Sequence, residues 1–291
     1  METAIEKARV LIEALPYIQA FKDRIVVIKY GGSTIADNSP EASILRDVAL
    51  MKSVGMRPIL VHGGGKSITK RLAGAGIPTV FVQGLRVTDA ASMAIVEDVL
   101  MNEINAAIVA TLGNFGCEAE PLSGKTGRML RVRKLTGVDE AGAPIDWGFV
   151  GEVLRVNPRP IFDVLLANRI PVIAPIGVGE DDQAYNINAD TVAAEIAASL
   201  TAEKLVYLTD VPGILYDPKD PATVISTIHV PDVPGLKTAG VISGGMIPKI
   251  DACVHALNNH VFKTHIVSGL IPHSLLLEIF TDKGVGTEIV P

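Results

Sequence analysis

The sequence predicts an α/β protein built around an open, mostly parallel sheet with helices on both faces. Short apolar runs alternate with longer amphipathic stretches through most of the 291 residues, which is the pattern of strand–helix–strand units. Hydrophobic residues make up 48% of the chain and aromatic residues only 4%, and a core of Ala, Val, Ile and Leu suits a parallel sheet buried on both faces. Glycine-rich and polar motifs directly follow several apolar runs, at the strand ends where such sheets bind ligands.

Residues 3–21 precede the first predicted strand and are predicted to form an amphipathic helix. Apolar residues from Ile5 to Ile18 recur at helical spacing. Pro16 lies inside this segment and disfavours helical geometry at Leu15, so we expect a kinked helix outside the main fold. The segment has no long apolar core and does not resemble a signal peptide, and no apolar run in the chain approaches the roughly 20 residues that span a bilayer.

The alternation begins after this helix. Ser39 and Pro40 are expected to open the first helix of the main fold as N-cap and first-turn proline, and Thr88 is expected to cap a long helix. The predicted strands cover residues 24–30, 57–61, 170–175, 204–209 and 263–267, and the predicted helices cover 39–55, a stretch from 66, 88–113, 158–168, 189–200 and 247–259. Residues 129–135 and 146–156 look instead like a hairpin at one edge of the sheet.

Charge and cysteine content argue against a nucleic-acid-binding, disulfide-bonded or metal-binding protein. The 26 basic and 32 acidic residues give a net charge of −6, which does not suit a nucleic-acid-binding protein with a concentrated basic face. Cys117 and Cys253 show neither metal-ligand spacing nor a disulfide framework, so we expect a reducing, cytoplasmic location. The six histidines show no zinc spacing either, and no metal ligand is predicted.

The stretch VHGGGKS, residues 61–67, suggests a phosphate-binding turn of an unfamiliar kind. A Walker A loop would need glycine where Leu60 stands, and a dinucleotide fingerprint would need a small residue where Ile68 stands. What remains is a glycine turn between a strand and a helix N-terminus, where backbone N–H groups and the helix dipole favour an anion. The alternative is a tight turn with no ligand, but ordering three glycines is entropically costly, which favours the close approach of a ligand.

Two basic residues at the predicted strand ends have a functional and a structural interpretation. Lys29 ends an apolar strand before Gly31 and Gly32, so it is either functional or extends to solvent. Arg86 follows a glycine turn and could grip a carboxylate or phosphate through two hydrogen bonds, or form a surface ion pair.

Polar residues of the second half complete the candidate site. Asn186, Asn188 and Asp190 alternate before an alanine-rich helix, and a single helix cap would need only one of them. Thr209 and Asp210 end another predicted strand. Lys249 begins a helix, where it opposes the dipole unless a polyanion neutralises both. Glycine turns, two lysines and an aspartate at such ends predict a polyphosphate site.

With these motifs in order, the sequence resembles the amino acid kinase family over almost its whole length. The motifs that carry the resemblance are IKYGG, VHGGG, GLRVT, NINADTVAAEIA, LTDVPGIL and GGMIPK. The resemblance implies a three-layer αβα sandwich with two lobes around the mostly parallel sheet. It assigns residues 1–22 to an oligomerisation helix, 23–200 to a lobe for the amino-acid substrate, and 201–291 to a lobe for ATP and an effector.

Within that family, VHGGG, GLRVT and NINAD are similar to the branch that phosphorylates the γ-carboxylate of N-acetyl-L-glutamate with ATP and Mg²⁺. The resemblance implies catalysis by Lys29 and Lys249, with Asp190 holding both. It implies that substrate is bound by Gly64, Gly65, Arg86, Asn186 and Asn188, and ATP by Gly31, Gly32, Thr209, Asp210 and Lys249. Other members of the family, acting on glutamate or aspartate, remain alternatives, as do a Rossmann-type oxidoreductase and a non-catalytic amino-acid sensor of the same fold.

The N-terminal helix adds an expectation about regulation. Members of this branch with such an extension resemble an arginine-inhibited type, a hexamer assembled as a trimer of dimers. The resemblance then places L-arginine between the helix and the C-terminal lobe, with Tyr17, Lys204, Glu278 and Gly284 as candidate contacts. It also raises a PII-type signalling protein as a partner, for which the sequence offers no motif of its own.

Overall fold

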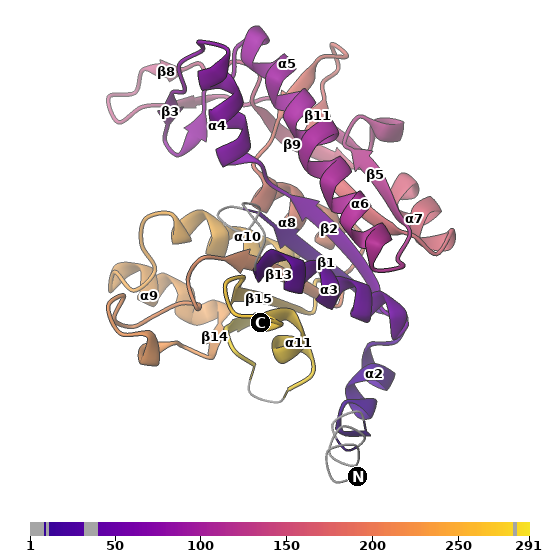
Figure 1. The fold of residues 1–291 in the computed structure, drawn as a ribbon. Coiled ribbons are helices and arrows are strands. Elements are labelled where there is room, and N and C mark those ends of the chain that lie inside the picture. Colours follow the sequence, from indigo (N-terminus) through magenta and orange to yellow (C-terminus); the bar gives the residue numbers. More distant parts are fainter. Residues whose placement is uncertain (1–8, 10–11, 32–39, 282–283) are drawn as a thin grey trace.

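The computed structural model describes residues 9, 12–31, 40–281 and 284–291. Its centre is an eight-stranded sheet with the strand order β14-β16-β15-β13-β1-β2-β10-β5 (Figure 1). The strands are β14 (Thr227–His229), β16 (Thr287–Val290), β15 (Lys263–Ser268), β13 (Lys204–Thr209), β1 (Ile25–Tyr30), β2 (Arg57–His62), β10 (Ile170–Ala174) and β5 (Ala119–Ser123). All neighbours are parallel except β15 and β16, so the mostly parallel sheet expected from the sequence is confirmed.

Helices cover both faces of this sheet, which gives the three layers. Alternate residues of each central strand enter different cores: Val27 of β1 packs with α8 and α10, whereas Val26 and Ile28 pack with α3, α6 and α11. The helices of the first face are α8 (Ala189–Ser199) and α10 (Met246–Asn258), and those of the second are α3 (Pro40–Ser53), α6 (Ala106–Asn114) and α11 (Ser274–Ile279). Lys29 lies two residues after Val27 in β1, so its side chain is on the same face of the sheet and faces α8 and α10.

The predicted hairpin belongs to a second sheet rather than to an edge of the first. β6 (Leu130–Lys134) and β9 (Gly151–Val156) pair antiparallel, as expected, within a four-stranded sheet of order β12-β11-β6-β9. β11 (Ile176–Val178) and β12 (Ala184–Asn186) complete it. The chain passes from β10 into β11 through Pro175, which cannot donate to a ladder, and this separates the two sheets.

The long helix predicted over 88–113 is three consecutive segments with a different cap. Asp89, not Thr88, caps α5 (Ala90–Asp98) by accepting a hydrogen bond from the Ser92 N–H, so the expectation for Thr88 is wrong. Thr88 is buried, and its hydroxyl donates to the backbone oxygen of Arg86 instead. A π-helical segment, η2 (Val99–Asn105), then leads into α6.

The remaining elements are short. α4 (Gly65–Gly74) follows the glycine turn, and β3 (Phe81–Val82) pairs with β4 (Leu85–Arg86) beside it. The others are α7 (Arg159–Leu166), α9 (Val233–Thr238) and the pair β7 (Gly137–Val138) and β8 (Pro144–Ile145).

The N-terminal helix breaks just before its proline. Residues 9, 12 and 13 are helical, Ala14 lies in a turn, and α2 (Leu15–Phe21) follows with Pro16 in its first turn. None of the residues of α2 is fully buried, and the helix lies at the edge of the molecule (Figure 1). No helix in the described part of the chain has both the length and the apolarity to cross a membrane.

Candidate active site

Two lysines share one aspartate where β1 meets the first turns of α8 and α10. Lys29 lies near the end of β1, Asp190 in the first turn of α8 and Lys249 in the first turn of α10. The Lys249 ammonium donates to Asp190 Oδ2 at 2.5 Å, and the Lys29 Nζ lies 2.9 Å from Oδ1 as an ion pair. The sequence thus places three charged groups at separate strand and helix ends, and the fold brings them together.

The electrostatics of this cluster favour an ionised aspartate with two charged partners. Burial alone raises the pKa of the Asp190 carboxyl, but the Lys29 and Lys249 ammonium groups outweigh it and hold the pKa below its usual value. The side chain of Lys29 is 10% exposed to solvent, that of Lys249 20% and that of Asp190 15%. Two cations against one anion leave about one positive charge in a poorly solvated place, which is suited to an anionic ligand.

The glycine turn packs against both the first strand and the π-helical segment. Gly63 donates to the backbone oxygen of Tyr30 at 2.9 Å, and a Cβ on Gly31 would lie 2.9 Å from the Gly63 nitrogen. A Cβ on Gly64 would lie 2.7 Å from side chains of the π segment, whereas one on Gly65 would enter open space. Gly64 is therefore required by packing, and Gly65 keeps the cavity open. Gly32, assigned to ATP, lies outside the described residues.

Arg86 is a buried arginine held without a carboxylate. Its guanidinium donates to the Gly65 backbone oxygen at 3.0 Å and to the Thr69 hydroxyl at 2.8 Å, and it stacks on the Phe81 ring at 4.8 Å. Burial lowers the pKa of Arg86, and across the described residues no acidic side chain forms an ion pair with it. The positive charge is thus uncompensated beside the glycine turn, so the surface ion pair considered from the sequence is not what the fold forms.

Lys29, Asp190, Arg86 and the glycines of the turn line one cavity of about 260 Å³, and Lys249 reaches it only through its contact with Asp190. Asn186 and Asn188 also reach it, and the Asn188 side-chain oxygen caps α8 by accepting from the Asp190 and Thr191 N–H groups. The residues that line the cavity are Lys29, Gly63, Gly64, Gly65, Ile68, Phe81, Arg86, Leu100, Pro175, Asn186, Ile187, Asn188, Ala189 and Asp190.

Thr209 and Asp210 lie apart from this cavity, at the carboxyl end of β13. The buried Thr209 hydroxyl donates to the Val211 backbone oxygen at 2.8 Å, which stabilises the turn after the strand. Asp210 is exposed in that turn. Both residues are at the same edge of the sheet as Lys29, on the side of the C-terminal elements.

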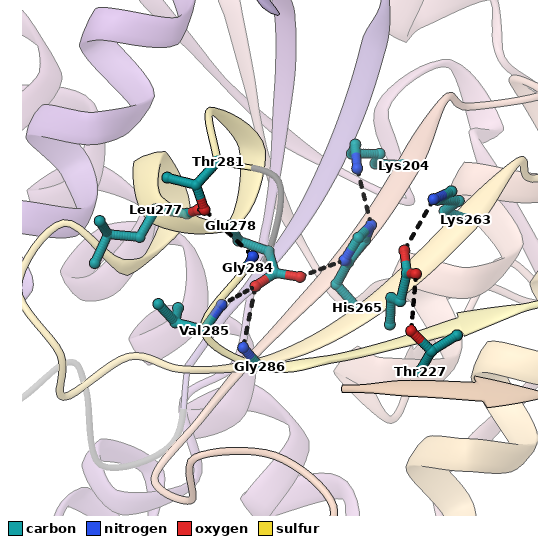
Figure 2. A network of polar contacts seen from close by, with 11 residues as sticks. Lys204, Thr227, Lys263, His265, Leu277, Glu278, Thr281, Gly284, Val285 and Gly286 are labelled. Atoms are coloured by element: carbon teal, nitrogen blue, oxygen red, sulfur yellow. Dashed lines mark hydrogen bonds and ion pairs between the residues drawn. The ribbon is translucent and has the colours of Figure 1, made fainter. Parts of the chain in front are cut away.

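A second, larger cavity of about 670 Å³ lies between α2 and the C-terminal elements. Tyr17, Lys204, Glu278 and Gly284 all line it, so the four candidate effector contacts meet in one place. Figure 2 shows the centre of this cavity: the Lys204 ammonium donates to His265 Nε2 at 3.1 Å, and His265 Nδ1 lies 2.7 Å from Glu278 Oε1. The ion pair of Lys263 and Glu288 also lines the cavity, and Glu288 is the register partner of His265 in the ladder between β15 and β16.

The charges in this second cavity are tightly coupled. Burial raises the pKa of Glu278, but His265 and the N–H groups of Val285 and Gly286 outweigh it and lower the pKa. Burial also lowers the pKa of Lys204, and the neighbouring Lys263 adds to that effect. Gly284 is needed here because a Cβ would lie 2.6 Å from a Glu278 oxygen, so the close approach at Gly284 is to Glu278.

Comparison with known proteins places the chain in a family. The model of the amino acid kinase family matches residues 24–268. The chain belongs to the amino acid kinase family. Relatives named acetylglutamate kinase cover its whole length: that of Heliobacterium modesticaldum is 50% identical over 100% of both chains, and that of Moorella thermoacetica is 51% identical over 99% of this chain and 98% of the relative.

Solved structures show the same fold. N-acetylglutamate synthase from Neisseria gonorrhoeae, complexed with coenzyme A and N-acetyl-glutamate, matches 97% of this chain with a TM-score of 0.82 and 26% identity. The chain spans only 62% of that synthase. Carbamate kinase from Giardia lamblia, bound to AMP-PNP, matches 92% of this chain and 98% of its own with a TM-score of 0.63 at 15% identity, which concerns the fold alone.

The amino acid kinase motifs did not identify every residue of these two sites. Phe81 was not predicted to stack on Arg86, and His265 was not predicted to join Lys204 to Glu278. His265 lies in the buried strand KTHIVS, and a titratable side chain within a strand is the sequence feature that could have indicated it.

Proposed function

We propose that the protein transfers the γ-phosphoryl group of ATP to the γ-carboxylate of N-acetyl-L-glutamate, as a step of arginine biosynthesis. The observation that carries the proposal is that Lys29 and Asp190 line one cavity with the uncompensated Arg86 guanidinium, while Lys249 is paired to the same Asp190 carboxylate. The full-length relatives near 50% identity, named acetylglutamate kinase, support this choice of acceptor over glutamate or aspartate.

The residues fit a reaction between two anions. The acceptor carboxylate is ionised at neutral pH, so no general base is required. Charge spreads over the phosphoryl oxygens in the transition state, and Lys29 and Lys249 stabilise it while Asp190 keeps both ammonium groups in position. Gly64 and Gly65 supply backbone donors to the acceptor and the phosphoryl group in transit.

Substrate recognition falls to the polar groups around the cluster. Arg86 binds the α-carboxylate of the amino acid, since its guanidinium is held by neutral groups and has no acidic partner among the described residues. Asn186 and the amide nitrogen of Asn188 orient the rest of the acceptor. Gly31, Gly32, Thr209 and Asp210 border ATP together with Lys249, on the side of the C-terminal lobe.

Mg²⁺ enters this proposal with the nucleotide, where it neutralises charge on the phosphates. In the described part of the chain no three His, Cys, Asp or Glu side chains gather as metal ligands. The negative phosphates and the exposed Asp210 carboxylate are the groups that suit a hard cation there.

The test is release of ADP, measured with N-acetyl-L-glutamate, glutamate, aspartate and carbamate as separate acceptors. We expect turnover with N-acetyl-L-glutamate to exceed that with the other three. A preference for another acceptor would assign a different kinase activity, and no ADP release with any acceptor would favour a non-catalytic sensor. Binding of a nicotinamide cofactor would favour an oxidoreductase.

We further propose that L-arginine binds the 670 Å³ cavity and inhibits the enzyme. Lys204 suits the ligand carboxylate, and the carboxylate of Glu278 suits its guanidinium. Glu278 already accepts from His265, Val285 and Gly286, so about one lone-pair site remains for the ligand. Tyr17 covers the cavity from α2, and Gly284 forms its rim. A structure of the related synthase is complexed with L-arginine, at 24% identity.

The proposal includes a homo-oligomer, a hexamer assembled from three dimers through the N-terminal helix. The exposed apolar residues Ile12 and Leu15 support this because they need a partner surface. The cytoplasm is the compartment that fits a biosynthetic enzyme with two unpaired cysteines.

A further inference from the structure

Tyr207 lies at the point where the three charged groups of the active site meet. It is a fully buried residue of β13, and in the ladder between β13 and β1 it is the register partner of Lys29. Its hydroxyl donates to the backbone oxygen of Asp190 at 2.9 Å. Its ring centroid lies 5.9 Å from the Lys249 ammonium. One side chain therefore neighbours all three members of the cluster.

The hydroxyl fixes the first turn of α8 on the sheet. Asp190 sits in that turn, and its carboxylate must face Lys29 and Lys249 at once. The bond from Tyr207 of β13 to the Asp190 carbonyl ties this turn of the helix to the sheet. Burial raises the pKa of Tyr207 well above its ordinary value, with Cys253 and Asp190 adding to it, so the hydroxyl stays a donor at any working pH.

The ring has a separate role, because it can stabilise the Lys249 ammonium group without neutralising its positive charge. An aliphatic side chain beneath Lys249 would remove water from the ammonium group and provide no favourable interaction in its place. A second carboxylate would hold the ammonium but cancel the charge that ATP phosphates need. The face of an aromatic ring attracts the cation and accepts no strong hydrogen bond, so the ammonium protons stay available to phosphate.

We propose that Tyr207 is a positioning residue for phosphoryl transfer, acting on Asp190 through its hydroxyl and on Lys249 through its ring. The proposal rests on the kinase function proposed above. It separates into two parts, because Tyr207→Phe removes only the hydroxyl and Tyr207→Leu removes the ring as well.

The first test measures ADP release with N-acetyl-L-glutamate by the full-length variants. We expect kcat to fall about fivefold in Tyr207→Phe, the size of one lost hydrogen bond, with the KM for N-acetyl-L-glutamate within about twofold of wild type. The matched control is Tyr185→Phe, since Tyr185 is also buried and its hydroxyl bonds the Asp181 carboxylate at 2.9 Å, away from the cluster. Equal kcat values in Tyr207→Phe, Tyr185→Phe and wild type would overturn the role of the hydroxyl.

The second test asks whether the ring acts through Lys249. In the wild-type background, we expect kcat of Tyr207→Leu to lie about threefold to fivefold below that of Tyr207→Phe. In a Lys249→Ala background that ratio should fall to about one, because the cation is gone. A ratio unchanged by Lys249→Ala would mean that the ring only fills space, and would overturn the positioning role of the ring.

These outcomes are distinct from failure of the proposed function. If wild-type enzyme prefers another acceptor, the function is reassigned and the same comparison is made with that acceptor. If Tyr207→Leu does not fold, judged by its circular dichroism and melting temperature, Tyr207→Met is the replacement that keeps volume without a ring. The same ratio, with Tyr207→Phe as its reference, then decides the question.

Discussion

At the scale of single residues, the active site depends on an imbalance of charge. Asp190 forms ion pairs with two ammonium groups and balances the charge of only one, and Arg86 is buried without a carboxylate among the described residues. Both excess charges border the same cavity. An anionic substrate at Arg86 and a polyphosphate at the lysines would complete the balance, and binding energy and catalysis then come from the same groups.

Lys249→Ala should reduce turnover while leaving the affinity for N-acetyl-L-glutamate nearly unchanged. The lysine acts on charge that develops at the phosphoryl group, so its loss should lower kcat on the order of 10²-fold or more. Steady-state ADP release gives kcat, and calorimetric titration gives the acceptor affinity. Lys125→Ala is a matched control, because Lys125 is half exposed and pairs with Glu97 at the surface. Near-wild-type turnover in Lys249→Ala would contradict the mechanism.

Arg86→Lys keeps the charge and removes the planar, two-pronged donor. The variant cannot reach Gly65 and Thr69 and also grip a carboxylate, so KM for N-acetyl-L-glutamate should rise about tenfold or more with KM for ATP little changed. The exposed Arg131→Lys should leave both constants unchanged. An effect confined to ATP would show that the two lobes are assigned in reverse.

The charged residues of the site could be predicted because they stand at strand and helix ends, which a parallel sheet brings to one edge. Tyr207 and His265 were not predicted, since each lies inside a buried strand rather than at its end, and its partners belong to other elements. Hydrogen bonds from Tyr207 to Asp190 and from His265 to Glu278 follow from the stacking of helices on the sheet, which the local pattern does not encode.

At the scale of elements, α3 and α11 are joined by a buried acid. Asp47 of α3 has no exposed surface, and its Oδ1 lies 2.6 Å from His273 Nδ1, just before α11. α11 carries Glu278, which lines the 670 Å³ cavity. Burial raises the pKa of Asp47, and His273 and nearby N–H groups reduce this effect without cancelling it.

Asp47→Ala should therefore destabilise the fold by about 2 kcal/mol at pH 7, the size of a hydrogen bond to a charged group. Because the folded-state pKa of Asp47 lies above its unfolded value near 3.8, folded wild type takes up a proton before the unfolded chain does as the pH falls. Asp47 thus favours the folded state more at low pH, and the stability gap between wild type and the variant should widen from pH 7 toward pH 4.

Urea unfolding of both proteins at several pH values measures that gap. Asp251→Ala is the control, since Asp251 is more than half exposed and pairs with Lys237, so it should cost less than about 1 kcal/mol at each pH. A gap that narrows on acidification would show that His273 keeps Asp47 ionised throughout.

Elements were predictable where periodicity was strong. The five predicted strands and the helices after them are present, with ends displaced by at most two residues. β5 (AEPLS) was not predicted because a proline and polar residues are not typical of a buried strand, although they are tolerated in an edge strand. β14 and β16 were not predicted because they are only three and four residues long. The π segment within 88–113 was missed because its apolar pattern matches that of an α-helix.

At the scale of the whole molecule, one sheet runs through both predicted lobes. The boundary predicted at 200/201 falls between α8 and β13, whereas the ladder continues from β1 to β13, with Val26 opposite Lys204. Lys204 therefore starts a strand whose far end, at Thr209, reaches the active-site edge. A ligand at Lys204 and a ligand at Lys29 act on neighbouring strands, which offers a direct physical connection between effector and substrate.

α2 is tied to the elements around the 670 Å³ cavity by two aromatic contacts. The Phe21 ring lies 5.2 Å from the Lys204 ammonium, and Tyr17 packs edge-on against Phe280 at 6.4 Å. Deletion of residues 1–22 removes both contacts and the exposed apolar stripe. If L-arginine acts by favouring an expanded ring in which the lobes cannot close, the truncated protein should be a dimer, active, and indifferent to arginine.

Light scattering and an arginine titration of ADP release test this, and a point variant separates assembly from binding. Tyr17→Ala keeps the helix but opens the cavity wall, so the protein should remain a hexamer and need about tenfold more arginine for half inhibition. Loss of the hexamer in Tyr17→Ala would assign Tyr17 to the subunit contact instead. A truncated protein that is still hexameric, or still inhibited at unchanged arginine concentration, would show that neither assembly nor the effector response depends on this helix.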